Sequence, residues 1–244
     1  MDGADMSDKT CMSYWFPKIE AAGLPVPRTT LLTMPRDALS DLFLFFDGEK
    51  PKGLAEPFFE EVKSAAAKIG YPIFLRTGHT SGKHDWERTC FVSGPNDVLS
   101  HVVNLIEFSE MASLIGMPLE IWAVREMLQT IPFGTCKRYH NMPICREFRF
   151  FVDDGEIQCW HPYWPLDSLL KQGRAEFPNR IFDYGEFCAL ENETPLREIA
   201  IAAGKAVGGA WSVDLLETEN GWFLIDMAEA HKSWHWPECE RAAA

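Results

Sequence analysis

The chain has 244 residues, enough for one large domain or two small ones and for a sizeable core. Hydrophobic residues make up 46% of it and charged residues 24%, as is ordinary for a soluble globular protein. The net charge is −13 without a basic tract, which argues against binding duplex nucleic acid through the overall field but still allows a local basic pocket. No apolar run reaches about 18 residues, so no segment is predicted to cross a membrane.

The cysteines are scattered, odd in number and contain no CxxC pair. This distribution predicts reduced thiols in a cytoplasmic protein, rather than a disulfide framework or a zinc site. The segment from Met1 to Thr10 is polar and acidic without an apolar stretch, so no signal peptide is predicted. The seven cysteines are Cys11, Cys90, Cys136, Cys145, Cys159, Cys188 and Cys239.

The first half of the chain is expected to alternate short helices and strands. Residues 1–11 are predicted to be disordered, and residues 47–53 to form a loop. Two prolines force residues 24–32 into an extended path that suits a strand. In residues 56–69 apolar side chains recur at helical spacing, and Gly70 follows where a helix usually ends. Helices are expected at 13–22, 36–45, 56–69 and 96–111.

Residues 71–84 combine a short apolar strand with a loop rich in glycine, hydroxyl and basic side chains. A strand that ends in a cation, followed by a flexible loop rich in free N–H groups, is an arrangement that can bind phosphate. Arg76 ends the strand, and the loop carries Ser81, Gly82 and Lys83. The alternative is a plain surface turn, because glycine-serine loops are common.

The second half is expected to be mostly strands, with one helix at 195–207. Asp-Asp-Gly at 153–155 and Thr-Glu-Asn-Gly at 218–221 are typical of hairpin turns. Residues 129–143 are expected to form a loop, and residues 165–193 a long one with little regular structure. Strands are expected at 89–93, 119–128, 145–153, 156–163, 211–217 and 222–227, and a tail after Pro237.

These elements predict an α+β protein with two lobes. The N-terminal lobe is expected at 12–118 and contains the Gly/Ser-rich loop. The C-terminal lobe is expected at 119–244, beginning at a hinge segment near 123–128. A cleft between lobes is the usual place for a ligand.

Asp214 and Asp226 lie on two strands joined by a tight turn, so they can come side by side among Val, Leu and Ile. A carboxylate among apolar strand residues is costly unless a cation pairs with it. Two such carboxylates indicate a hard divalent cation, and Mg²⁺ is favoured because carboxylate and phosphate oxygens suit it. The alternative is two acids at strand edges, each paired with an arginine or lysine.

Two further strands carry candidate binding groups. Alternation along residues 146–152 places Glu147 and Arg149 on the face opposite to Phe148 and Phe150, and a surface ion pair is the alternative to ligand binding there. The strand end with Arg125, Glu126 and Leu128 offers backbone groups that can hydrogen-bond a base edge, although a purely structural strand is the simpler explanation.

The segment after the acidic strand, residues 228–236, gathers His231, Lys232 and His235 among aromatic residues. This cluster suits a substrate anion or carboxylate. Histidines beside acids also suggest zinc, but the spacing is not that of HExxH, so zinc is not favoured.

In this order the motifs resemble those of the ATP-grasp superfamily, over about residues 12–236. Each motif alone is degenerate, and their order and spacing make the resemblance specific. The segments are the entry AAGLPVPRT at 21–29, the strand YPIFLR at 71–76, the Ser/Gly-rich loop at 78–83, the interlobe strand at 124–128, the E-x-R strand at 147–149, and the metal strands at 213–214 and 225–226.

The resemblance implies an ATP-grasp fold, with ATP held between the antiparallel sheets of two α+β lobes and accompanied by Mg²⁺. Arg76 and Arg149 are the implied catalytic residues, and Asp214, Asp226 and Glu229 the implied metal ligands. His231 and Lys232 are expected near the substrate. The implied nucleotide-binding residues are Arg76, Ser81, Gly82, Lys83, Arg125, Glu126, Leu128, Glu147 and Arg149.

Two positions depart from the family pattern. Arg76 stands where lysine is usual, and it keeps the charge and can chelate phosphate as a fork. Ala228 stands where the second metal strand normally carries asparagine, so Glu229 is expected to replace the missing oxygen. The arginine resembles a divergent bacterial and phage clade, which implies a host cytoplasm if the protein is phage-encoded. The strand at 147–152 is also similar to that of ATP-grasp chaperones that assemble a translation initiation factor.

ATP-grasp enzymes generally activate a carboxylate as an acyl phosphate, which an amine then attacks. The resemblance therefore implies an ATP- and Mg²⁺-dependent carboxylate–amine ligase whose substrate is an amino acid, a peptide, a protein or another small molecule. The main alternative is an ATP-binding assembly factor that binds a partner protein without ligation, and a kinase-like phosphotransferase is a third.

Overall fold

The computed structural model describes residues 8–46, 53–112, 116–170, 175–177, 182–236 and 239. Most of the expected loop at 47–53, most of the tail after Pro237 and the first seven residues, where disorder was expected, lie outside these ranges. The chain divides into two compact units, each built from two stretches of sequence. Unit 1 comprises Met1–Ser13 and Arg28–Met127, and unit 2 comprises Tyr14–Pro27 and Leu128–Ala244. None of the helices in the described ranges has the length and apolar character that a membrane span needs.

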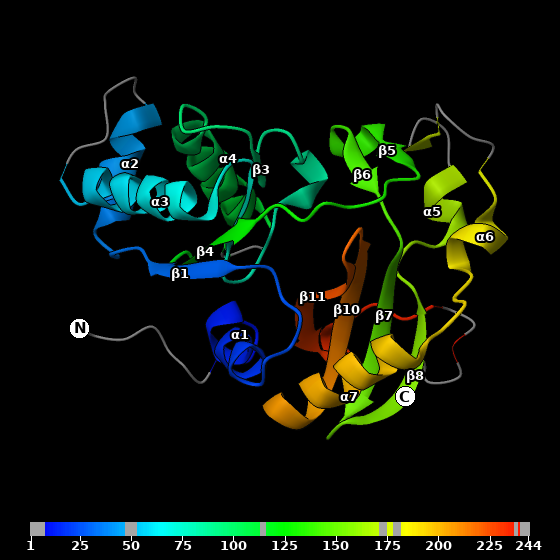
Figure 1. Cartoon of the computed structure of the whole chain (residues 1–244). Coiled ribbons are helices and arrows are strands. Elements are labelled where there is room, and N and C mark those ends of the chain that lie inside the picture. Colours follow the sequence, from blue (N-terminus) through cyan, green and yellow to red (C-terminus); the bar gives the residue numbers. More distant parts are fainter. Residues whose placement is uncertain are drawn as a thin grey trace. The chain divides into compact units, whose positions relative to one another are not determined.

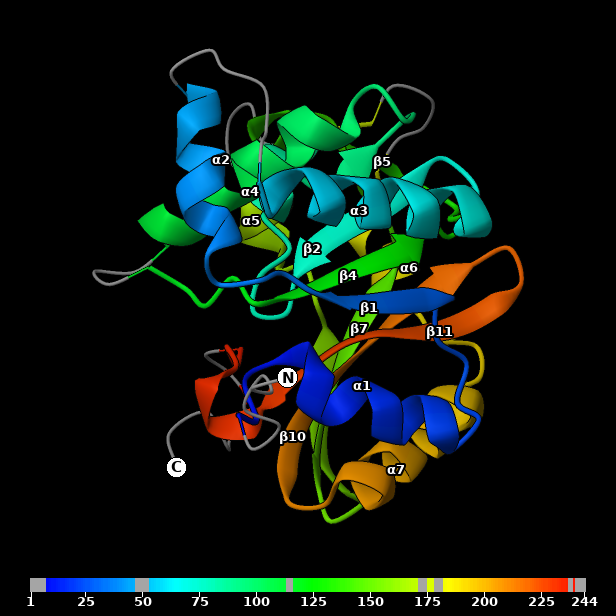
Figure 2. The same ribbon diagram turned by 90° about the vertical axis from the view of Figure 1, so that its left-hand side faces the viewer.

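Unit 1 is built on an antiparallel sheet whose strands lie in the order β1-β4-β2-β3. Figure 1 shows the neighbouring strands β1 and β4 of this sheet. Three helices accompany it, and Figure 2 shows α3 running along the sheet. The strands are β1 Thr29–Thr33, β2 Ile73–Thr77, β3 Phe91–Val92 and β4 Ile121–Glu126, and the helices are α2 Ala38–Phe46, α3 Ala55–Ile69 and α4 Val98–Met111.

The core of unit 1 lies between the sheet and its helices. Alternation along β2 and β4 directs Ile73, Leu75, Trp122 and Val124 into one cluster, all of them fully buried. The expected helical face of α3 is confirmed, because Phe58, Phe59, Val62, Ala65 and Ala66 are buried in the same cluster. The opposite face of the sheet is therefore available for polar side chains.

The strand expected to open the second lobe belongs to unit 1 instead. β4 pairs with β1 on one side and with β2 on the other, and nearly all of its side chains are buried. β4 can fill this central place because it supplies Trp122 and Val124 to the core face, while its alternate side chains, Ala123 and Arg125, are also buried. The expectation that residues 119–128 begin the C-terminal lobe is thus wrong.

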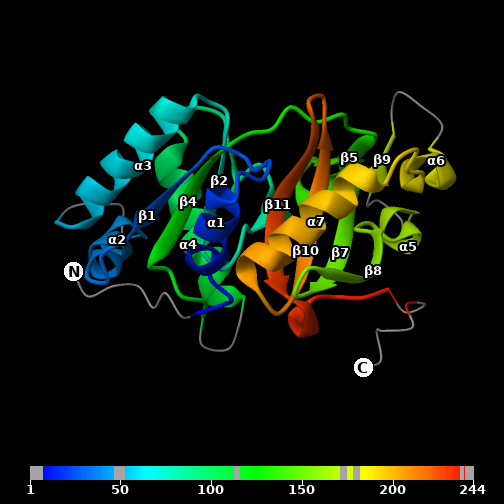
Figure 3. The same cartoon turned by 60° about the horizontal axis from the view of Figure 1, so that its bottom comes forward.

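Unit 2 is built on a second antiparallel sheet, in the order β11-β10-β7-β8, with α7 lying across β10 and β7 (Figure 3). Its core face consists of Phe148, Phe150, Trp211, Val213 and Leu215, all at most 1% exposed. The elements are β7 Glu147–Asp153, β8 Glu156–Pro162, α7 Thr194–Val207, β10 Ala210–Thr218 and β11 Gly221–Glu229. Both expected hairpins are confirmed.

A segment from near the start of the chain completes unit 2. Helix α1 spans Met12–Ala21, and the ring of Tyr14 stacks on that of Trp211 with centroids 5.9 Å apart. Further along, the backbone N–H of Leu224 in β11 donates to the carbonyl of Pro25 at 2.8 Å. Residues 14–27, expected in the N-terminal lobe, thus belong to unit 2.

Two regions of unit 2 that were expected to be loops contain regular structure. Residues 129–143 hold β5 and part of β6, and residues 165–193 hold two short helices and β9. These elements are too short to show a period, and they are fixed by tertiary contacts such as that of Phe133 with Phe187, whose ring centroids are 5.1 Å apart. The elements are β5 Gly134–Cys136, β6 Met142–Ile144, α5 Leu166–Leu170, β9 Ala175–Glu176 and α6 Tyr184–Cys188, and the strands pair in the order β6-β5-β9.

The first described residues are also more ordered than expected. Asp8 accepts hydrogen bonds from Thr10 and lies 2.9 Å from Nε2 of His79, and Cys11 is buried. Burial alone would raise the pKa of Asp8, but these hydrogen bonds lower it below its usual value. The expectation of disorder is therefore wrong for residues 8–11.

Candidate functional site

A row of polar side chains crosses the sheet of unit 2 on the face away from its core. Asp226 of β11 pairs directly with Asp214 of β10, Asp214 with Arg149 of β7, and Arg149 with His161 of β8. Directly paired residues in a sheet point to the same face, so these four side chains form one line across all four strands. The expected side-by-side placement of the two aspartates is confirmed.

Arg149 and Asp214 form a bidentate ion pair at the centre of this row. Nε and Nη2 of Arg149 each donate to one oxygen of Asp214 at 2.7 Å, and the Asp214 side chain is 6% exposed. The guanidinium also lies 4.8 Å from the ring centre of Tyr163. Burial alone would lower the pKa of Arg149, but the charge of Asp214 and its two hydrogen bonds raise it above the usual value. Arg149 therefore pairs with Asp214, rather than in a surface ion pair with Glu147. Glu147 is only 6% exposed, so it is not a surface residue.

Two of the three expected metal ligands fit Mg²⁺, and the third does not. Each Asp214 oxygen accepts one hydrogen bond from Arg149, which leaves it a second lone pair, and Oδ1 of Asp226 accepts the backbone N–H of Met227 at 3.1 Å. Glu229 pairs in register with Trp211, so it points to the core face, and its carboxylate lies 2.6 Å from Nζ of Lys232. Glu229 therefore does not replace the missing asparagine oxygen.

The ion pair between Glu229 and Lys232 involves one of the two expected substrate residues, His231 and Lys232. Lys232 is engaged with Glu229, and both it and His231 lie exposed in a short 3₁₀ turn, Ala230–Lys232. The structure thus places these two side chains in the turn that directly follows β11.

His161 completes the polar row and was not found by sequence analysis. Its Nδ1 lies 2.9 Å from the carbonyl of Pro162, while its Nε2 is buried and has no hydrogen-bond partner among the described residues. Burial lowers the pKa of His161, and the nearby charge of Arg149 lowers it further. The neutral ring therefore presents a lone pair on Nε2. A regular hairpin continued from the 153–155 turn would set Trp160 opposite Arg149, and an irregularity between Phe151 and Val152 brings His161 there instead.

Unit 1 carries two buried arginines on the face of its sheet away from the helices. Arg76 is 5% exposed and donates to the carbonyl of Thr77 at 3.1 Å, and Arg125 is 3% exposed and donates to Oγ1 of Thr29 at 3.2 Å. Phe74 pairs with Arg125 and precedes Arg76 by two residues, so both guanidinium groups lie on one face in neighbouring rows. Only backbone contacts were expected near Arg125, so its buried charged side chain is a further candidate binding group.

The loop after Arg76 is held by its own hydrogen bonds. The backbone N–H groups of Gly78, His79, Thr80 and Gly82 donate to acceptors within unit 1. The expected loop with free N–H groups is therefore wrong for these four, since the Thr77 and Thr80 hydroxyls accept three of them. Ser81 and Lys83 are half-buried, and Lys83 begins a 3₁₀ turn, Lys83–Asp85.

Gly82 has a structural role in this loop. Its φ is +61°, and a Cβ there would lie 2.9 Å from Cδ2 of Leu105 and 3.2 Å from Cβ of Thr89. Only glycine adopts this conformation in this space without strain.

The two remaining expected nucleotide contacts differ in their surroundings. Glu126, at the end of β4, forms an ion pair with Arg28, which also donates to the carbonyl of Ile69 at 2.9 Å. Leu128 is half-buried and begins the second stretch of unit 2.

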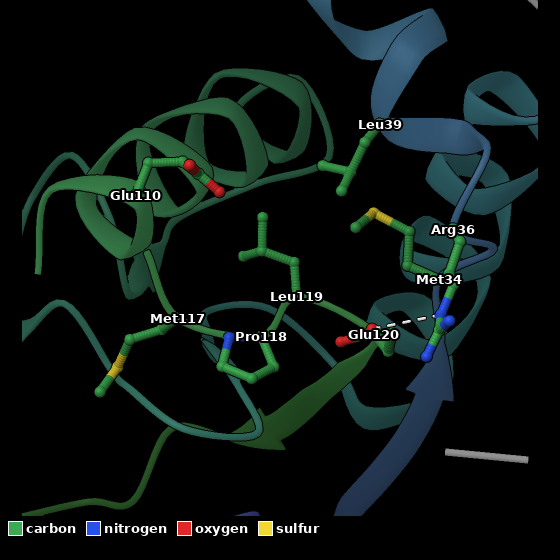
Figure 4. Close-up of a pocket in the computed structure, with 8 residues that line it drawn as sticks. All are labelled: Met34, Arg36, Leu39, Glu110, Met117, Pro118, Leu119 and Glu120. Carbon is green, nitrogen blue, oxygen red and sulfur yellow. Dashed lines mark ion pairs between the residues drawn. The ribbon is translucent and has the colours of Figure 1, made fainter. Parts of the chain in front are cut away.

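A small cavity of about 160 Å³ lies elsewhere in unit 1 (Figure 4). Met34, Leu39 and Leu119 turn toward it, and Arg36 forms an ion pair with Glu120 beside it at 3.5 Å. It is below the roughly 300 Å³ at which ligand pockets usually begin. None of the expected site residues lines it, so it is separate from the candidate site.

No protein-family model matches this sequence, and a search of curated protein sequences finds no match. Solved structures do match. Cdc123 from Schizosaccharomyces pombe is similar with a TM-score of 0.59 and 11% identity, over 91% of this chain and 85% of that chain. The ATP-grasp ligase PsnB, solved with a minimal precursor, is similar with a TM-score of 0.51 and 13% identity, over 97% of this chain and 57% of that chain.

This chain has the ATP-grasp fold. At these identities the likeness speaks for the fold alone. The chain spans 59%, 54% and 57% of three of the matched proteins, so it corresponds to little more than half of their length.

The ATP-grasp motifs recognised in the sequence lie on the strands that carry the polar groups. The strand with Arg76 is β2, the interlobe strand is β4, the E-x-R strand is β7, and the two metal strands are β10 and β11. In this chain the β7, β10 and β11 motifs meet in one polar row, while Arg76 and Arg125 share one face of the other sheet.

Proposed function

We propose that this ATP-grasp chain is an ATP- and Mg²⁺-dependent carboxylate–amine ligase acting in the cytoplasm on an amino acid, a peptide or a protein. The observation that carries the proposal is the row of Asp226, Asp214, Arg149 and His161 on one sheet face of unit 2. Paired carboxylates beside a fixed cation suit a nucleotide phosphate and its metal ion.

Arg149 would bind phosphate oxygens without having to be ordered first. Two hydrogen bonds to Asp214 and one to the carbonyl of Trp234 already fix its orientation, and its unused guanidinium donor capacity can face an anion. A cation that is positioned before the substrate arrives needs no reorganisation during the reaction, and this is where most electrostatic catalysis comes from.

Asp214 and Asp226 would hold the Mg²⁺ ion, which when bound neutralises phosphate charge. Their lone pairs are of the hard oxygen type that this ion requires, and the ion usually keeps only one or two protein carboxylates besides waters and phosphate oxygens. The absence of a third ligand at Ala228 therefore weakens metal binding without preventing it.

Arg76 and Arg125 support nucleotide binding independently of the polar row. Both residues are more than nine-tenths buried and lie on one sheet face, and planar guanidinium groups suit phosphate oxygens. We propose that they bind phosphate oxygens, with Lys83 as a third cation of unit 1.

The test is MgATP binding by isothermal calorimetry, followed by mass spectrometry of products formed from ATP, Mg²⁺ and a panel of carboxylates and amines. Asp226→Ala and Arg76→Ala should each weaken MgATP binding at least tenfold, whereas Glu219→Ala, in the β10–β11 turn, should leave it unchanged. A ligase should release ADP together with an amide product. Equal effects of all three substitutions, or no binding at millimolar MgATP, would refute the proposal.

A second candidate is an ATP-binding assembly factor that does not ligate. Two observations favour it: Asp214 is neutralised by Arg149, and Ala228 offers no metal oxygen. Weak metal binding would permit nucleotide-dependent recognition of a partner protein without turnover. A stoichiometric partner that requires ATP, together with no ADP release across the substrate panel, would select this function.

A further inference from the structure

A cluster of soft metal ligands lies at the edge of the unit 2 sheet, apart from the carboxylates. The ligand atoms of Cys159, His235 and Cys239 all lie within 4.8 Å of one another, and Sγ of Cys159 is 3.9 Å from Nδ1 of His235. All three side chains are half-buried. Within the described ranges, this is the one group of three Cys, His, Asp or Glu side chains that gathers so closely.

The segment that carries His235 is fixed on the sheet without any ion. Its ring stacks on Phe151 with centroids 3.5 Å apart and planes 21° apart, and Phe151 is the direct partner of Cys159 in the β7–β8 pairing. Nearby, the hydroxyl oxygens of Ser233 and Ser212 are 2.6 Å apart. Packing against the sheet therefore holds the His235 imidazole beside the Cys159 thiol.

The third ligand, Cys239, is held by a backbone hydrogen bond. Its N–H donates to the carbonyl of Trp236 at 2.9 Å. Cys159 and His235 are 76 positions apart, so their proximity leaves no trace in cysteine spacing. The spacing in the sequence therefore did not favour a zinc site.

The separations fit a tetrahedral ion. Metal–sulfur and metal–nitrogen bonds of Zn²⁺, about 2.3 and 2.05 Å, place two sulfurs about 3.8 Å apart and a sulfur and a nitrogen about 3.6 Å apart. The observed 3.9 Å between Cys159 and His235 differs from this by a few tenths of an ångström, within reach of a side-chain rotation. Two thiolates and one imidazole favour Zn²⁺, whereas Mg²⁺ requires oxygen ligands.

We propose that Cys159, His235 and Cys239 bind one Zn²⁺ ion, with the fourth position left to a water molecule or a ligand atom. Binding releases the two thiol protons. The ion would tie His235 and Cys239 to the edge strand β8. Arg149 donates to the carbonyl of Trp234 at 3.4 Å, so the same segment contacts the central ion pair of the polar row.

The test uses the full chain, reduced and freed of metal by a chelator, and titrated with Co²⁺ as a spectroscopic probe. We expect one equivalent to produce the visible bands of a tetrahedral site together with the near-ultraviolet band of thiolate-to-cobalt charge transfer, and one equivalent of Zn²⁺ to remove both. Cys159→Ser and Cys239→Ser should each halve the charge-transfer band or abolish it. His235→Ala should weaken Co²⁺ binding at least tenfold.

Cys188→Ser is the matched control, because Cys188 is another half-buried thiol of unit 2 that lies outside the cluster. It should leave the cobalt spectrum unchanged. If the cluster variants fail to fold, X-ray absorption at the zinc edge of the wild-type chain still decides, since two sulfur neighbours and one imidazole are expected. A spectrum without thiolate bands, a site that survives the double change of Cys159 and Cys239 to serine, or an oxygen-only zinc environment would overturn the proposal.

Discussion

The Arg149–Asp214 pair gives a quantitative prediction, because both side chains are nearly inaccessible to solvent. The Arg149 side chain is 13% exposed and that of Asp214 is 6% exposed. Replacing Arg149 by Met keeps most of the packing of its stem but leaves the buried carboxylate without its cation. Asp226 stands directly opposite Asp214 in the sheet, so the variant also brings two like charges together.

The expected cost follows from the loss of one partner of a buried pair. Removing one partner costs about 3–5 kcal/mol, because the remaining charge keeps its desolvation penalty. For a chain of this length, each kcal/mol lowers the melting temperature by about 2–4 °C, so Arg149→Met is expected to melt roughly 6–20 °C below wild type. Replacing the pair together, as Arg149→Met with Asp214→Leu, should cost less than about 2 kcal/mol, because an apolar pair needs no desolvation.

The measurement is a double-mutant cycle from urea unfolding, combined with hydrogen exchange of peptides from β7 and β10. The exchange data report unit 2 by itself, which matters because the two units need not unfold together. The matched control is Arg197→Met, which removes an exposed i,i+4 pair with Glu193 and should change stability by less than about 0.5 kcal/mol. If Arg149→Met stays within about 1 kcal/mol of wild type, or if the double variant costs the sum of the single ones, the reasoning about burial is wrong.

Three further predictions concern single positions. Gly82→Ala should destabilise the chain by about 1–3 kcal/mol in urea unfolding, because a Cβ clashes there and φ is positive, whereas Gly94→Ala, where a Cβ meets open space, should change it by less than about 0.5 kcal/mol. Arg146→Ala removes an ion pair with Glu217 and donors to two carbonyls near α6, so limited proteolysis should cut that region several-fold faster, and unchanged rates would contradict this anchoring role. The pKa of Asp8 is lowered in the folded chain, so the ionised Asp8 stabilises the fold above its unfolded pKa of about 3.9, and this stabilisation is lost as the pH falls through the folded pKa. The free energy of unfolding of wild type should therefore fall more than that of Asp8→Asn between about pH 5 and pH 3. Parallel plots of this free energy against pH would refute the prediction.

Long periodic elements could be predicted from the sequence. Five helices, expected at 13–22, 36–45, 56–69, 96–111 and 195–207, are confirmed within two residues at each end. A helix repeats its apolar face over several turns, so its sequence carries the signal many times. The pieces of two to five residues in the expected loops carry no repeat, and only tertiary contacts define them.

The pairing of the two aspartates shows that turn residues predict a hairpin but not its full strand register. The turn pairs Thr218 with Gly221, and a regular hairpin continued from there would set Ile225 opposite Asp214. The structure instead has an irregularity between Asp214 and Leu215 that shifts the pairing by one residue and brings Asp226 opposite. The motif therefore indicated the right pair, while the hairpin rule alone would have placed the second carboxylate on the core face.

Partners that are distant in sequence could not be predicted. A surface pair with Glu147, two positions away, was the alternative considered for Arg149, but its actual partner lies 65 positions along the chain. Charge and strand alternation identify which side chains share a face, but not which neighbouring strand supplies the counter-ion. The same limitation hid His161 and its buried Nε2, because its environment comes from residues of other strands and of the 233–236 segment.

The division of unit 2 into two stretches has a consequence for how this chain is made. Tyr14 and Pro25 emerge early in synthesis, yet their partners Trp211 and Leu224 follow roughly two hundred residues later. Because so long a loop must close, residues 14–27 can dock on the sheet of unit 2 only late in synthesis. Until then, α1 of the nascent chain lacks the sheet against which it packs. A fragment of residues 128–244 alone would lack the ring that covers Trp211 and the acceptor for the Leu224 N–H. Adding a separate peptide of residues 12–27 should restore both.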